Sequence, residues 1–363
     1  MGSRHRALAS VLLLASCSTR APSSLPPAPL GVVDLHVDLP HALHVEHRPI
    51  DDSTLDASID RLRRGEVGLI VLPILVPRPE GESPASLRQA YEATRATALA
   101  ALGSPSARDA FTLPGAPARS GRVATLFSFE GADGFADRPE AIAPWIERGA
   151  CLFGLVHQLT NGLAGSSQDP DPARRALGLT DAGRAVTRAV YRHGGLVDVA
   201  HASDAAFDDI AAIARGFSAP LVDSHTGVRA LAPMDRNIDD TRLRVVAASG
   251  GVVGIDLHSG HVGREPGTAA TLDDVATHIM HAVEVAGIAH VAIGSDLDGG
   301  IVPPRDADGE ASWPALTRRL EARGLGPRDR AAILHDNAAR TVGWSLARGC
   351  GKGGARAARS ETR

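Results

Sequence analysis

Several residue types are scarce in this 363-residue sequence, and each shortage excludes a class of protein. Three cysteines do not make a disulfide framework, so a small disulfide-stabilised scaffold is excluded. Aromatic residues make up 3% of the chain and the formal net charge is −4, so we expect no nucleic-acid partner. No apolar run is long enough to cross a bilayer. The remaining composition, 44% hydrophobic and 22% charged, is that of an ordinary globular protein.

The N-terminus has the pattern of an export signal. Arg4–Arg6 precede the apolar run Ala7–Ala15, which suits the hydrophobic region of a signal peptide. The run leads into Leu14–Cys17, which resembles a bacterial lipobox, where the signal is cleaved before the cysteine and the cysteine is lipidated. The alternative is a plain signal peptide with a chance cysteine. We expect a membrane anchor at Cys17 and, because Ser18 follows it, an envelope protein on the periplasmic side of the outer membrane.

The chain divides into four parts. Residues 1–16 are the expected signal peptide, and residues 17–30 are the lipidated cysteine and a proline-rich tether. Residues 31–345 are expected to form one domain, and the Gly-, Arg- and Ala-rich residues 346–363 a disordered tail. Cys151 lies in an apolar run and is expected to be buried. Export would allow it to pair with Cys350, but the sequence leaves that pairing open.

Eight short, apolar, β-branched runs predict eight strands, most of them followed by an amphipathic stretch. These runs are Val32–Asp38, Val67–Val76, Val123–Glu130, Cys151–His157, Leu196–His201, Pro220–His225, Val252–Leu257 and His290–Asp296. Nearly continuous apolar runs are typical of strands that are buried on both faces. Helical patterns lie between them, at Ser83–Leu102, Thr180–Arg192, Asp204–Ala214, Asp239–Ala248 and Leu272–Ala286, whereas Gly103–Ser120 has the composition of a loop. Strand–helix alternation without a glycine-rich phosphate motif predicts an α/β fold, a closed (β/α)8 TIM-like barrel.

Polar residues close most of these strands. His36 and Asp38 are two positions apart, so an extended strand points both side chains to one face. The other strand ends supply Glu130, His157, His201, His225 and Asp296. In a barrel these positions meet at one mouth. Imidazoles and carboxylates without a thiolate suit zinc or a similar ion, and the set is large enough for two ions bridged by a carboxylate, about 3.5–4 Å apart.

Each of these residues has a simpler interpretation when taken alone, because a histidine at a strand end is commonly just hydrogen-bonded. We expect Asp34 and Asp198 to be structural and Asp223 to orient a ligand. The remaining histidines are expected on the surface or in helices; they include His41, His44, His47, His193, His258, His261, His278, His281, His290 and His335. The joint pattern of successive strand ends is what predicts a metal centre.

The order and local context of these residues resemble the membrane dipeptidase (renal dipeptidase) family of zinc metallopeptidases, over most of the chain from Val32 to Val342. The similar segments are Asp34–Pro40, Phe129–Gly131, Leu155–Asn161, Gly178–Thr180, Gly195–His201, Ser224–His225 with Arg229–Leu231, Arg236–Asp240 and Gly294–Gly299. Val37 and Gln158 depart from the residues often found there, without touching the ligand set.

The resemblance implies a role for each residue. His36 and Asp38 would bind one zinc ion, His201 and His225 a second, and Glu130 would bridge them. A hydroxide between the ions would be the nucleophile. Asp296 would act as general base and then acid, His157 would donate to the developing oxyanion, and His157, Asn161 and Arg236 would bind the substrate. For Asp296 the alternative is Asp298, which has the same strand parity, and for Arg236 it is a surface salt bridge with Asp239 or Asp240.

The function implied is that of a zinc-dependent dipeptidase that tolerates D-residues on the carboxyl side of the scissile bond, with dipeptides as substrates. Members of the family often form dimers, so a homodimer is implied without support from the residues themselves. Two alternatives remain: an N-acyl-amino-acid or lactam amidohydrolase that uses the same metals, and a non-catalytic envelope lipoprotein that keeps the barrel for binding.

Overall fold

The computed structural model describes residues 31–77, 82–263 and 268–353. The expected signal peptide, the lipidation site Cys17 and the tether lie outside the described residues. Among the described residues, no helix combines the length and the apolar character that crossing a membrane requires.

Nine parallel strands form the sheet. They are β1 (Val32–Asp34), β2 (Val67–Leu75), β3 (Phe111–Thr112), β4 (Val123–Glu130), β5 (Ala150–Gly154), β6 (Leu196–Asp198), β7 (Val222–Thr226), β8 (Val252–Ile255) and β9 (Val291–Ile293). Their order is β2-β1-β9-β8-β7-β6-β5-β4-β3, and β2 also pairs with β4. That last pairing closes eight strands into a barrel and leaves the two-residue β3 beside β4, within the segment expected to be a loop.

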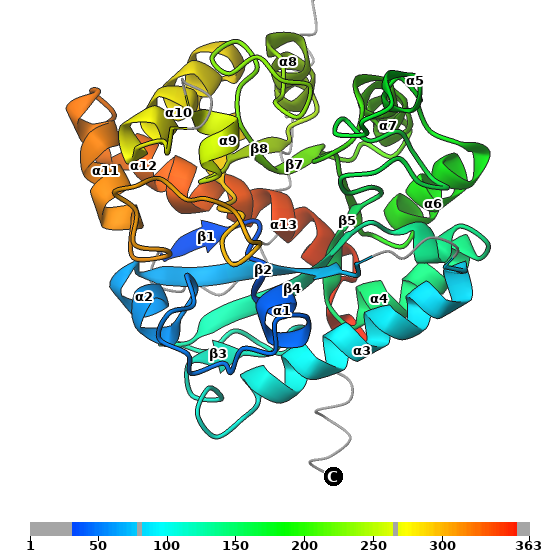
Figure 1. Ribbon diagram of the computed structural model, residues 1–363, viewed down its shortest axis with the longest axis horizontal. Helices are drawn as coiled ribbons and strands as arrows, with labels where there is room; N and C mark the ends of the chain where they lie inside the picture. Colours follow the sequence, from blue (N-terminus) through cyan, green and yellow to red (C-terminus); the bar gives the residue numbers. More distant parts are fainter. Residues whose placement is uncertain (1–30, 78–81, 264–267, 354–363) are drawn as a thin grey trace, which may run out of the picture.

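Helices surround the barrel, with α3 on one side and α10 and α11 on the opposite side of the view in Figure 1. The α-helices are α1 (Leu39–His44), α2 (Ile59–Arg64), α3 (Pro84–Leu102), α4 (Ala143–Glu147), α5 (Pro172–Arg175), α6 (Asp181–Arg192), α7 (Asp204–Gly216), α8 (Asp240–Ala248), α9 (Ser259–Val262), α10 (Leu272–Ala286), α11 (Trp313–Ala322), α12 (Pro327–Ala331) and α13 (Asn337–Arg348). Shorter turns are η1 (Asp133–Phe135), η2 (Pro139–Ile142), η3 (Ile288–His290) and the π-helical η4 (Ala332–Asp336).

The long helices begin where the sequence predicts because their capping residues act locally. The Ser83 side chain accepts a hydrogen bond from the Ser86 amide at the start of α3, and Thr180 does the same for Gly183 at the start of α6. The strands are shorter than predicted: β1 ends at Asp34, and β6 ends at Asp198. Most of the polar residues assigned to strand ends therefore lie in the segments that directly follow the strands.

An aromatic cluster packs between the barrel wall and its cover on the side of β4. Phe129 stacks on Phe153 with ring centroids 5.1 Å apart, and its ring meets those of Tyr91 and Trp145 edge-on at 5.0 Å. These side chains are buried, so they hold the end of β4, where Glu130 follows Phe129, in one position.

The C-terminal boundary expected at residue 345 is wrong. Helix α13 continues to Arg348, and Cys350 is buried in a disulfide with Cys151 of β5. The pairing that the sequence left open is therefore present, and the segment that carries Cys350 is folded. Residues 354–363 of the expected tail lie outside the described residues.

Candidate metal centre

The predicted ligands come together at the carboxyl end of the barrel. Glu130 is the last residue of β4 and His225 lies in β7, while His201 lies three residues beyond β6. A parallel bridge between Val37 and Leu297 joins the segments that follow β1 and β9. The Asp296 amide donates to the His36 carbonyl oxygen at 3.0 Å, which places the two segments and their side chains side by side.

Glu130 lies at the centre of the cluster. Its Oε1 atom is 2.8 Å from His201 Nε2, 3.6 Å from His225 Nε2 and 3.7 Å from His36 Nε2. Asp38 Oδ2 lies 3.5 Å from His36 Nε2. All five side chains are buried. One carboxylate thus lies between two pairs of ligand-type groups, which is the arrangement of a bridged two-ion site.

Two features of these side chains suit divalent cations: the type of their ligand atoms, and the buried polar atoms among them that have no hydrogen-bond partner. Two groups have ligand atoms that all lie within 4.8 Å of one another and share Glu130: His36 with Asp38, and His201 with His225. His36, His225 and Asp296 form a third such group. His36 Nε2 and Asp38 Oδ1 are buried without a hydrogen-bond partner. Burying such unpaired polar atoms costs free energy, and coordination to a cation would offset that cost.

The charges of the cluster agree with this role. Burial and the Arg236 charge hold the pKa of His201 well below its usual range, and burial and the His36 charge do the same for His225. Both imidazoles are therefore neutral, as metal ligands must be. Burial lowers the pKa of His36, but the Asp38 and Glu130 carboxylates outweigh it and raise that pKa to about 10. A cation would replace that proton.

Hydrogen bonds from surrounding residues fix the orientation of the candidate ligands. His201 Nδ1 lies 2.6 Å from Gln168 Oε1, and His225 Nδ1 lies 2.8 Å from Ser224 Oγ, so in both rings Nε2 is the atom turned to Glu130. Asp34 and Asp198 are structural, as predicted. Asp34 Oδ1 accepts from the His36 and Ser295 amides, and Asp198 Oδ1 accepts from the Ala200 and Ser224 amides.

Two of the central residues have a strained backbone. His201 has a φ of 61° and Asp296 a φ of 64°, in the left-handed region that side-chain-bearing residues rarely adopt. Such strain persists only where the surroundings impose it, and it is common where a side chain must be aimed at a reacting group. At both positions the turn directs the side chain into the cluster.

Asp296 and Asp298 have different surroundings. Asp296 lies in the cluster, where burial and the Asp38 charge raise the pKa of its carboxyl well above the usual range. The Asp298 carboxylate instead accepts from the Asp56 amide at 2.8 Å and the Ala57 amide at 2.9 Å. Asp298 thus holds the loop before α2, and Asp296 is the carboxyl group available for proton transfer.

His157 and Arg236 border the cluster. His157 Nε2 is 3.9 Å from Glu130 Oε1, and its side chain is 30% exposed, so it can be reached from the mouth. Arg236 is 6% exposed, which rules out the surface salt bridge that was the alternative. Its Nη2 donates to the His225 carbonyl oxygen at 2.7 Å, and its Nε is buried without a partner. A buried guanidinium with a free donor beside the ligands suits an anionic group.

The sequence comparison decides the family. The pattern of the membrane dipeptidases, peptidase family M19, matches residues 28–345, which is most of the chain. The chain belongs to the membrane dipeptidase family. The resemblance inferred from the strand-end motifs is therefore confirmed.

Individual relatives are dipeptidases by name, and they match a smaller part of the chain. The chain is 30% identical over 223 residues to the dipeptidase aclJ of Aspergillus oryzae, a match that covers 61% of this chain and 52% of that protein. It is 32% identical over 209 residues to the dipeptidase verJ of Clonostachys rogersoniana, covering 57% and 51%. The chain thus matches about half the length of these relatives.

Solved structures share the fold. A metallopeptidase of Rhodobacter sphaeroides, solved with a phosphinate mimic of the dipeptide L-Ala-D-Ala, superposes with a TM-score of 0.76 at 22% identity, over 87% of this chain and 99% of that one. The probable dipeptidase PvdM of Pseudomonas aeruginosa superposes with a TM-score of 0.76 at 20% identity, over 88% and 96%. At these identities the likeness establishes the (β/α)8 architecture.

Asn161, expected to bind substrate by likeness to the family, is hydrogen-bonded within its own loop. Its Nδ2 donates to the Leu155 carbonyl oxygen, and its Oδ1 accepts from the Leu163 and Ala164 amides. The structure records no contact between Asn161 and the metal cluster among the residues it describes. The amide thus shapes the loop after β5, which also carries His157, and the substrate contact expected of Asn161 stays a prediction.

Asp256 and His261 form a buried pair that the strand-end pattern did not predict. Asp256 follows β8 and is fully buried, and its Oδ2 lies 2.7 Å from His261 Nδ1. His261 lies in α9 but is buried rather than on the surface, and its carbonyl oxygen accepts from Asn237, the residue after Arg236. The spacing of Asp34 and His36 recurs at Asp256 and His258, whose amide donates to Asp256 Oδ1 at 3.1 Å, so the sequence offered a signal for Asp256 but none for His261.

Proposed function

We propose that this protein is a two-zinc dipeptidase that cleaves the peptide bond of dipeptides and tolerates a D-residue on the carboxyl side. One observation carries the proposal. Glu130 lies between two pairs of ligand-type side chains, and the buried Arg236 lies against the second pair, with Nη2 3.4 Å from His201 Nε2. Two cations would act on the scissile bond, and the positive charge of Arg236 beside them would bind a carboxylate. This arrangement suits a substrate whose terminal carboxylate is one residue beyond the scissile bond, as in a dipeptide.

His36 and Asp38 would hold one ion, His201 and His225 the other, and Glu130 both. When bound, such ions polarise a carbonyl group and lower the pKa of water. No thiolate competes in the cluster, and the imidazole–carboxylate set suits zinc. The paired ligand groups, together with the unpartnered His36 and Asp38 atoms, support two ions rather than one.

The protein side chains would supply the rest of the chemistry. Asp296, buried at the cluster, would accept a proton from the attacking water and pass it to the leaving amine. His157 would donate from Nε2 to the oxygen of the scissile carbonyl as negative charge develops there. Arg236 would bind the terminal carboxylate through its buried Nε. This pairing excludes longer peptides because a further residue would occupy the place of the carboxylate.

The proposal includes the location inferred from the N-terminus: export, a lipid anchor at Cys17 and residence in the cell envelope. The Cys151–Cys350 disulfide supports export, because disulfides persist in oxidising compartments. The homodimer implied by the family stays a prediction.

The test is a dipeptide panel, L,L against L,D, assayed with and without a chelator, together with an N-acetylated dipeptide and a dipeptide amide. We expect cleavage of free dipeptides, loss of activity in chelator with recovery on adding zinc, and little cleavage of the amide. Cleavage of N-acyl amino acids in place of dipeptides would support an amidohydrolase. A purified protein that binds no zinc and cleaves nothing would support a binding lipoprotein.

A further inference from the structure

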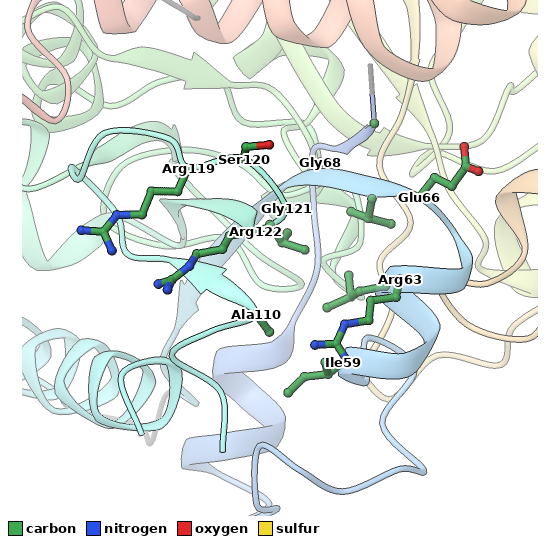
Figure 2. A pocket seen from close by; sticks show the side chains of 13 residues that line it. Ile59, Arg63, Glu66, Gly68, Ala110, Arg119, Ser120, Gly121 and Arg122 are labelled. Carbon is green, nitrogen blue, oxygen red and sulfur yellow. The ribbon is translucent and has the colours of Figure 1, made fainter. Parts of the chain in front are cut away.

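A cavity opens at the end of the barrel opposite the metal centre. It has a volume of about 350 Å³ and lies where β1, β2 and β4 begin, since Gly31, Val67 and Val123 line it (Figure 2). Its other lining residues are Ile59, Leu62, Arg63, Glu66, Gly68, Ala110, Arg119, Ser120, Gly121 and Arg122. The aliphatic members are all partly or fully buried, so the cavity has an apolar floor.

The rim of this cavity is basic. Figure 2 shows Arg119 and Arg122 on the segment that leads into β4, and Arg63 on α2. Arg63 and Arg119 are exposed, and neither makes an ion pair with any residue in the described part of the chain. Arg122 pairs with Asp109 at 2.9 Å, and Glu66 is the acidic residue in the lining. Two arginine charges are therefore available to an outside partner.

An apolar loop adjoins the same rim. Between β3 and β4, Leu113 is 37% exposed, and Ala116, Pro117 and Ala118 are exposed as well. Exposed Lys352 lies near this loop, because a Cβ at Gly115 would stand 3.4 Å from the Gly351 carbonyl oxygen. We call Arg63, Leu113, Arg119 and Lys352 the base surface. Cationic side chains flanking exposed apolar ones are what an anionic bilayer surface binds.

We propose that the base surface docks on an anionic phospholipid bilayer and turns the metal centre toward the aqueous side. The described chain begins at Gly31, inside this cavity, and the expected anchor is Cys17. The intervening residues 18–30 reach at most about 45 Å, so an acylated N-terminus would hold this end of the barrel near the membrane. Which membrane the protein meets in the cell depends on the proposed envelope location. The docking itself does not depend on the peptidase chemistry.

The experiment measures vesicle binding without the lipid anchor. A chain from Ser18 to Arg363, which keeps the whole barrel, is sedimented with vesicles of phosphatidylethanolamine and phosphatidylglycerol, and with phosphatidylcholine vesicles as the neutral reference. We expect binding to the anionic vesicles that falls as NaCl rises from about 0.1 to 1 M, where the Debye length shrinks from about 10 to about 3 Å. R63E/R119E should lower the partition coefficient at least tenfold, because each arginine contributes about fivefold at such a surface.

The matched control is R318E, at an exposed arginine of α11 that also has no ion pair among the described residues. It should bind vesicles like the unaltered chain. L113S tests the apolar component and should weaken the binding that persists at high salt. Equal affinity for neutral and anionic vesicles, an unchanged R63E/R119E variant, or an equal loss in R318E would overturn the proposal. So would self-association through the base surface, seen as a dimer that R63E/R119E dissociates. Dipeptidase activity in solution, measured on the same variants, should not change.

Discussion

Cys151 of β5 and Cys350, two residues past α13, form a disulfide with Cα atoms 5.7 Å apart. The bridge joins positions 199 residues apart and fastens the last helix to the barrel wall. It lies away from the metal ligands in the fold, since Cys151 is near the start of β5 and His157 is beyond the end of that strand. The bond therefore concerns stability rather than catalysis.

Removing this bond should destabilise the fold without changing turnover. We expect C350S to lower the free energy of unfolding by about 2–5 kcal/mol, because the unfolded chain loses a constraint on a long loop. The measurement is urea unfolding of C350S and of the unaltered protein, each with and without reductant. Reductant should bring the unaltered protein down to the stability of C350S and leave C350S unchanged; a protein indifferent to reductant would show that the bond is absent or adds nothing.

Arg236 should control substrate affinity through the terminal carboxylate. R236K keeps the charge but loses the planar fork, so KM for a free dipeptide should rise about tenfold or more. For the corresponding dipeptide amide, R236K and the unaltered enzyme should differ little, because the amide offers no carboxylate to bind. R184K is the control: Arg184 of α6 pairs with Asp209, outside the cluster and away from the segment that carries Arg236. If R236K raised KM equally for dipeptide and amide, the carboxylate assignment would be wrong.

Asp296 and His201 should separate proton transfer from metal binding. D296N should retain two zinc ions but lose turnover by about 100-fold or more, the usual contribution of a general acid–base group. H201A should retain less than two ions, because it removes a ligand atom. Metal content by elemental analysis and steady-state kinetics are measured on the same samples. D298N serves as the neighbouring control and should affect stability more than kcat. Near-normal turnover in D296N would refute the proton-transfer role.

Asp209 of α7 should make stability depend on pH. Burial tends to raise the pKa of Asp209, but hydrogen bonds from Arg184 and from the Leu179 amide, both 2.9 Å, hold it below the usual value. Because the pKa is lower in the folded state, its stabilising effect is present above the unfolded value of about 3.9 and is lost as pH falls through the folded value.

The corresponding variant is D209N, with E284Q on α10 as a control at a carboxyl with no ion pair in the described chain. Unfolding of the metal-free proteins in urea should show D209N about 1–2 kcal/mol less stable at pH 7. The difference should shrink below pH 4, and E284Q should match the unaltered protein throughout. A difference that stays constant with pH would mean that packing, not charge, explains the loss.

Much of the metal centre could be predicted because its information is local. A barrel brings the ends of its strands to one mouth, so recognising apolar runs and the polar residues that close them was enough to gather His36, Glu130 and His225. Strand parity alone did not place His36 and Asp38, because β1 ends at Asp34 and the chain bends at Leu35; the bridge between Val37 and Leu297 holds this segment at the cluster. The capped helices were predictable for the same reason, since a cap and its helix are neighbours in sequence.

Local patterns, each spanning a few residues, were enough to predict the barrel and the candidate ligand residues in their order. Contacts between groups distant in sequence emerged only from the folded structure: Cys151 bonds Cys350, Arg236 is buried with an unpartnered Nε rather than paired on the surface, and Asp256 pairs with His261. The folded structure also shows that the Asn161 side-chain amide hydrogen-bonds within its own loop. These outcomes depend on the three-dimensional distance between atoms and on which partner is already engaged, and no local pattern encodes either.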